Sequence, residues 1–174
     1  MTTMTEPGVT TQVYRVWIKT TPERIWQAIT DPEWNARYGY AAPSFFELKP
    51  GGSFHSTANQ GMKDFAAANG FEVPDTIADG EVLEADPPRR LVQTWRMLMD
   101  PTAAAEPFTT LTYEIEEVKT QPGVCKLTVT HQLAGAPATA AMTAGSDEAG
   151  AGGGWAWILS DLKTLLETGK TFTE

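Results

Sequence analysis

Gly154-Trp155-Ala156-Trp157-Ile158-Leu159-Ser160-Asp161-Leu162-Lys163-Thr164-Leu165-Leu166-Glu167-Thr168-Gly169 is the stretch that decides the fold. Its apolar side chains recur at intervals of three and four, which places them on one face of an α-helix: Trp155, Ile158, Leu159, Leu162, Leu165 and Leu166. Gly169 can adopt the left-handed conformation that ends a helix. Most of the preceding chain has the pattern of β-strands, so we expect this helix to lie against a sheet.

The 174 residues are enough for one domain with a sizeable core. Residues 1–8 are polar and predict a flexible tail, followed by a single domain over residues 9–174. Val9 to Thr20 is rich in β-branched and aromatic residues and predicts the first strand. Thr21-Pro22-Glu23 and Asp31-Pro32 are helix starts, the second of a short helix that holds Trp34 and Tyr38.

Six further strands are predicted between these helices and the C-terminal one, separated by turns rich in proline and glycine. They cover residues 45–49, 53–57, 80–85, 91–99, 108–118 and 124–133. Strands that follow one another along the chain favour an antiparallel sheet with the helices on one face, an α+β fold.

Two segments are longer than the usual connection between strands. The insertion at residues 58–79 contains Met62, Phe65, Ala66 and Asn69 on one helical face, with Gly70 to end the turn. Met62, Phe65 and Phe71 are interpreted as a lid over the mouth of a cavity or as a dimer contact, because apolar side chains on a loop need a surface to close onto. The second segment, residues 134–154, is rich in alanine, glycine and threonine.

Composition excludes several classes of function. The net charge of −9 disfavours nucleic acid and anionic membranes as partners. Cys125 has no cysteine to pair with, and no group of cysteines and histidines could hold a metal, so neither a metal nor a cofactor is expected. Met1 to Thr11 lacks the pattern of a signal peptide, and no apolar run is long enough to span a membrane; we expect a cytoplasmic protein.

Five pieces of the sequence, in order, resemble one family. They are TPERIWQAITDP (21–32), LKPGGSF (48–54), GEVLEADPPRRLV (80–92) with Trp95, LTVTH (127–131), and GW (154–155) with LK (162–163). Over residues 13–170 the chain resembles the activator-of-Hsp90-ATPase-like (AHSA1) branch of the START/Bet v 1-like SRPBCC superfamily. The resemblance implies the helix-grip fold, a curved antiparallel sheet wrapped around the C-terminal helix, often with an apolar cavity between them. The insertion at 58–79 departs from the family pattern.

The relatives include ligand carriers, cyclases, a co-chaperone and uncharacterised bacterial proteins, so function has to be argued from the site. Alternation along the strands predicts which side chains face the helix. His131 shares the inward face of the last strand with Leu127 and Val129, and Tyr113 faces the same space. His131 is interpreted either as a polar group of the cavity or as a histidine whose hydrogen bonds are satisfied within the sheet.

No pair of residues predicts nucleophilic catalysis. Cys125 lies in a strand, where a buried thiol is inert. Glu114 and Glu116 point away from the face of His131, and the glycines at 150–154 lack the lysine of a phosphate loop. Trp157 lies on the polar side of the last helix, which predicts either cover by a loop or a partner surface.

The principal hypothesis is a binding protein for a small apolar or aromatic ligand held between the sheet and the C-terminal helix, as a monomer or homodimer. The aromatic content, six Trp, seven Phe and four Tyr, supports it. The predicted lining residues are Trp34, Tyr38, Phe54, Phe65, Trp95, Met97, Tyr113, His131 and Trp155. The alternatives are a polyketide cyclase or dehydratase with His131 as acid or base and Tyr113 as donor, and a co-chaperone-like interaction module.

Overall fold

The computed structural model describes residues 11–148 and 152–174. Seven strands form one antiparallel sheet in the order β1-β7-β6-β5-β4-β3-β2. The strands are β1 (Thr11–Lys19), β2 (Ser44–Phe46), β3 (Ser53–Thr57), β4 (Thr76–Asp86), β5 (Arg90–Met97), β6 (Thr109–Glu117) and β7 (Val124–Gln132). This curved antiparallel sheet with a long C-terminal helix confirms the predicted α+β helix-grip fold.

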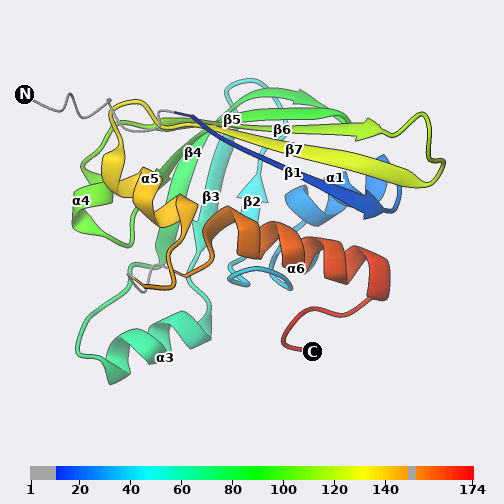
Figure 1. The fold of residues 1–174 in the computed structure, drawn as a ribbon. Coiled ribbons are helices and arrows are strands. Elements are labelled where there is room, and N and C mark those ends of the chain that lie inside the picture. The colour runs from blue at the N-terminus through cyan, green and yellow to red at the C-terminus, as the bar shows by residue number, and fades with distance from the viewer. Residues whose placement is uncertain (1–10, 149–151) are drawn as a thin grey trace, which may run out of the picture.

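The helices are α1 (Pro22–Thr30), α2 (Pro32–Asn35), α3 (Gln60–Ala68), α4 (Pro101–Ala104), α5 (Pro137–Ala144) and α6 (Gly154–Thr168). Figure 1 shows α5 and α6 beneath the sheet, with α3 projecting away from the body. None of the helices in the described ranges is long and apolar enough to cross a membrane.

The helix termini form where local chemistry predicts them. The Thr21 hydroxyl accepts from the Arg24 N–H and caps α1, with Pro22 in the first turn. Gly169 ends α6 with φ of +81°, which glycine adopts without steric cost. The second helix is shorter than predicted: it contains Trp34, but Tyr38 lies in the loop that follows.

The core lies between the inward face of the sheet and the apolar face of α6. Trp155, Leu159, Leu162, Leu165 and Leu166 are buried, and Ile158 is partly buried against them. On β7, each residue of the predicted inward face, from Cys125 through Leu127, Val129 and His131 to Leu133, is buried. Helix α6 packs most extensively on β1, the edge strand, and its Lys163 ammonium donates to the Trp17 carbonyl.

Two helices lie outside the predicted set. Helix α4 follows β5, and α5 occupies part of the alanine-rich segment 134–154. The N-cap of α5 is Ala136, which has no capping side chain. Instead, the Glu106 carboxylate accepts from the N–H groups of Ala138 and Thr139, both at 2.8 Å. The cap thus comes from a residue distant in sequence, and local reading of the chain cannot find it.

Candidate functional site

The structure brings four of the predicted lining residues into one cluster between the sheet and α6. The ring of His131 on β7 contacts Trp95 on β5 and Trp155 on α6, each edge to face, with centroids 5.5 Å and 6.1 Å away. The Tyr113 ring on β6 also meets the Trp155 ring edge to face, with the two centroids 6.1 Å apart. We call these four residues the aromatic junction, because they connect the sheet to the C-terminal helix.

Hydrogen bonds fix the protonation state of His131. The indole N–H of Trp155 donates to Nδ1 at 3.2 Å, and Nε2 lies 2.7 Å from the Thr109 hydroxyl. That hydroxyl donates its only proton to the Trp95 carbonyl at 2.8 Å, so it must accept from Nε2–H. The ring is therefore neutral, with its proton on Nε2. Burial lowers the pKa of His131 to about 4, which agrees with this assignment.

Gln93 lies on the same inward face as His131, with Leu111 between them in the cross-strand row. It is fully buried, and its amide N–H donates only to the Thr94 carbonyl at 3.3 Å. Its Oε1 is the one buried side-chain polar atom of the described ranges that has no partner. Because no exposed surface reaches Gln93, it contributes to the packing around the junction and offers no direct contact to a ligand.

The other predicted residues lie around the core. Tyr38 is buried and its hydroxyl donates to the Ala28 carbonyl, while burial raises its pKa far above the ordinary value. Trp34 is half-buried beneath the guanidinium groups of Arg24 and Arg37. Phe54 is buried against Phe46. Met97 is half-buried near the end of β5. None of these side chains lies beside Phe65, which the structure places in a different feature.

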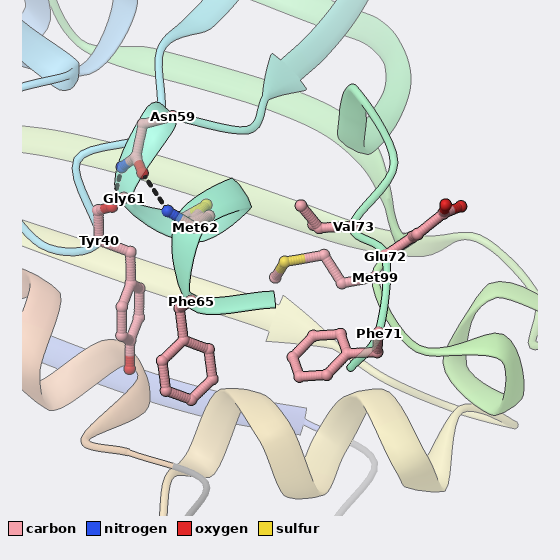
Figure 2. A pocket seen from close by; sticks show the side chains of 9 residues that line it. All are labelled: Tyr40, Asn59, Gly61, Met62, Phe65, Phe71, Glu72, Val73 and Met99. Carbon is pink, nitrogen blue, oxygen red and sulfur yellow. Dashed lines mark hydrogen bonds between the residues drawn. The ribbon is translucent and has the colours of Figure 1, made fainter. Parts of the chain in front are cut away.

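That feature is a pocket of about 450 Å³ beside α3, at the edge of the body, which we call the α3 groove. Figure 2 shows its lining residues: Tyr40, Asn59, Gly61, Met62, Phe65, Phe71, Glu72, Val73 and Met99. Large apolar side chains are left in contact with water here. Phe65 is 64% exposed and Phe71 is 51% exposed, and their rings meet edge to face. Met62 and Met99 add flexible thioethers, which adapt to varied apolar shapes.

The wall formed by α3 depends on one polar side chain. The Asn59 carbonyl oxygen caps α3 by accepting from the Met62 N–H at 2.8 Å. Its amide group donates to the carbonyls of Tyr40 and Ala41, which ties the start of α3 to the loop before β2. Elsewhere α3 makes no extensive contact with another helix or strand. The groove therefore has a firm wall on the body and an outer wall fixed mainly at its ends.

The groove carries little charge. Glu72 is its only charged lining residue among the described ones, and Figure 2 shows its carboxylate directed away from the aromatic rings. Lys63 on α3 forms an ion pair with Asp75 at 3.0 Å and lines a smaller hollow of about 230 Å³ on the other side of Phe71. The interior of the groove is thus apolar, with negative charge at its margin.

Sequence reasoning found Phe65, Met62 and Phe71 from the helical face and length of the insertion. Met99 follows the end of β5 at Met97, and sequence reasoning did not assign it to a site. Tyr40 had no local signal either. It lies between Gly39 and Ala41, whose positive φ values of 67° and 56° form the turn that directs its ring to the groove.

No acidic, histidine or cysteine group of three or more in the described ranges could hold a metal ion. Cys125 is buried, its thiol donates to the Thr20 carbonyl, and burial raises its pKa. Trp157 stays partly exposed between Phe172 and the Gly39 carbonyl, to which its indole N–H donates. None of these residues borders the α3 groove.

Comparison with known proteins identifies the relatives of this chain. The sequence profile described as activator of Hsp90 ATPase homolog 1-like protein matches residues 19–167. CalU16 from Micromonospora echinospora superposes with a TM-score of 0.57 at 20% identity, covering 91% of this chain and 77% of that one. No curated protein matches significantly.

Two further solved structures share this fold. An HSP90 activator from Plasmodium falciparum, PFC0360w, has a TM-score of 0.53 at 20% identity and covers 94% of this chain and 91% of its own. The Aha1 dimer from Colwellia psychrerythraea has a TM-score of 0.59 at 19% identity, with coverages of 92% and 98%. At these identities the likeness establishes a shared fold and no shared activity.

Proposed function

The chain belongs to the AHSA1 family, and on that premise we propose that it binds a small apolar ligand in the α3 groove. The observation that carries the proposal is the exposure of Phe65 and Phe71 around a pocket of about 450 Å³. Pockets for small molecules have volumes of this order and are lined mostly by apolar and aromatic side chains. Water in contact with these rings is released when a ligand covers them, which favours binding.

In this proposal some of the predicted lining residues contact the ligand, and others hold the core together. Phe65 contacts the ligand directly, whereas Trp95 belongs to the aromatic junction and Met97 ends β5, two residues before Met99. Trp155 and His131 act by fixing α6 to the sheet. We therefore propose the α3 groove as the ligand site, in place of the predicted site between the sheet and α6.

Acid–base catalysis by His131 receives no support from the described contacts. Both ring nitrogens are engaged within the protein, and the low pKa leaves no proton on Nδ1 to donate near neutral pH. The ring is fully buried and is not among the residues that line the groove. We therefore propose binding in preference to a cyclase or dehydratase activity.

The test uses N-phenyl-1-naphthylamine, a neutral probe whose fluorescence increases in apolar surroundings. We expect saturable binding to the wild-type protein and an affinity at least tenfold lower in the double variant Phe65→Ser/Phe71→Ser, since two large apolar contacts are lost. Trp17→Ser is the matched control: Trp17 is 50% exposed but lies on the outward face of β1. Equal affinity in all three proteins would refute the α3 groove as the binding site.

A second copy of the chain is the competing occupant of the same apolar surface. Light scattering coupled to size exclusion at two protein concentrations separates the two interpretations. A monomer that binds the probe supports the proposal. A dimer that the Phe65→Ser/Phe71→Ser variant converts to a monomer, with unchanged probe affinity, assigns the surface to self-association.

A further inference from the structure

Tyr40 is the one residue of the α3 groove that presents a hydroxyl group. Its ring is 45% exposed, and Figure 2 shows it extending in the same direction as the neighbouring Phe65 ring. The hydroxyl accepts a hydrogen bond from the Gly154 N–H at 3.0 Å, at the start of α6. This bond fixes the position of the oxygen relative to the body of the protein, so the polar group at this wall of the groove is held in place.

The proton of that hydroxyl has no acceptor within residues 11–148 and 152–174. The Gly154 bond uses the Tyr40 oxygen as acceptor, and the hydroxyl donates to no other described group. The other polar side chain near it, Asn59, is fully used, because both its oxygen and its amide group bond to the backbone. Among the side chains that line the groove in the described ranges, the Tyr40 O–H is therefore the donor left available to a ligand.

The charges around the groove indicate that the ligand is neutral. Glu72 lies at the margin of the groove, the nearby Lys63 is paired with Asp75, and the whole chain carries a net charge of −9. An anionic ligand would meet repulsion without a compensating cation. A neutral ligand meets no such repulsion, and its acceptor oxygen can bond to the Tyr40 O–H.

We propose that the α3 groove selects a neutral aromatic molecule bearing an acceptor oxygen, such as a ketone or quinone, which accepts a hydrogen bond from the Tyr40 hydroxyl. This inference rests on the proposed binding function and specifies its ligand class. The aromatic body lies against Phe65, Phe71 and the two methionines. Because the same hydroxyl accepts from Gly154, each bond polarises the other, which strengthens the contact with the ligand.

The experiment compares 2-acetylnaphthalene with 2-ethylnaphthalene, which has the same ring system and a similar side chain without the acceptor. Binding of each to the wild-type and Tyr40→Phe proteins is measured by displacement of N-phenyl-1-naphthylamine. We expect Tyr40→Phe to lower the affinity for 2-acetylnaphthalene about fivefold and to change the affinity for 2-ethylnaphthalene by less than about twofold. The ketone-specific loss is the readout, since loss of the Gly154 bond alone would affect both probes equally.

The outcomes separate this inference from the proposed function. If neither naphthalene displaces the fluorescent probe and that probe itself does not bind, the proposed function fails. If both bind and Tyr40→Phe changes them by the same factor, the groove binds ligands but the hydroxyl does not select them. Tighter binding of the anion 2-naphthoate than of 2-acetylnaphthalene to the wild-type protein would overturn the assignment of a neutral ligand.

Discussion

The aromatic junction and the α3 groove contain similar side chains and differ in what surrounds them. At the junction, every hydrogen-bonding atom of His131, Thr109 and the Trp155 indole has a partner inside the protein. In the groove, Phe65 and Phe71 remain largely exposed, and the Tyr40 hydroxyl donates to no group in the part of the chain that the structure describes. The burial and pairing of His131, Thr109 and the Trp155 indole indicate a structural role for these three residues, whereas exposed rings beside an unused donor indicate a surface that something else covers.

The largest effect is expected at the junction. Trp155→Ala removes a buried ring and the donor to His131, so we expect the free energy of unfolding to fall by about 3–5 kcal/mol. Trp155→Phe keeps most of the ring but leaves His131 Nδ1 unpaired, and should cost about 1–3 kcal/mol. Urea denaturation followed by circular dichroism measures both. A loss below about 1 kcal/mol for Trp155→Ala would show that the junction does not hold α6 to the sheet.

The second effect is a dependence of stability on pH through His131. An unfolded histidine takes up a proton below about pH 6.5, but the folded one does so only below about 4. Between these values the unfolded chain binds more protons, so the free energy of unfolding rises with pH. At 1.36 kcal/mol for each unit of pKa difference, we expect the neutral His131 to contribute about 3 kcal/mol to the free energy of unfolding. This contribution is fully present above about pH 6.5 and is lost as the pH falls to about 4.

The control for this prediction is His131→Gln, whose amide can accept from Trp155 and donate to Thr109 but does not titrate. Subtracting the pH profile of His131→Gln from that of the wild-type protein removes the contribution of the carboxylates that also titrate in this range. Direct NMR titration of the His131 ring gives its pKa without unfolding the protein. A pKa near 6.5 would mean that water reaches the ring and that the junction is open.

The contrast between the two regions also shows what the sequence could predict. Alternation on β7 placed His131 inward, and helical spacing placed Trp155 on the buried face of α6; both are confirmed. The same spacing found the face of α3 that carries Met62, Phe65 and Ala66. Periodicity identifies a helix face but cannot say what covers it: Ala66 is buried, while the neighbouring Phe65, which lines the groove, is exposed.

Long-range contacts explain what the sequence did not predict. Whether His131 is paired depends on Thr109 and Trp155, which lie 22 and 24 residues away. Tyr40 joins the groove through a turn with positive φ at Ala41, a residue type that does not indicate such a turn, and through a bond to Gly154, 114 residues further along. The groove therefore forms from three separated segments, and only the one on α3 has a local signature.

The smallest effect on stability is expected from removal of the outer wall. Deleting residues 60–72 joins Asn59 to Val73, and the Ala58 N–H already bonds the Asp75 carbonyl at 2.9 Å, with Thr57 paired to Thr76. The remaining three-residue connection suits a hairpin. Because α3 makes no extensive contact with the other elements, we expect the free energy of unfolding to change by less than about 1 kcal/mol.

Ligand binding should respond much more strongly to the same deletion. Met62, Phe65 and Phe71 are lost together, so a bound probe keeps only the contacts with Tyr40, Asn59, Val73 and Met99. It should dissociate faster, as stopped-flow dilution of the N-phenyl-1-naphthylamine complex would measure. The wild-type protein and the Trp17→Ser variant should release the probe at equal rates. A deletion that costs more than about 2 kcal/mol would place α3 in the core. A deletion that converts a dimer to a monomer with unchanged release would show that α3 is an interface and not the outer wall of a binding site.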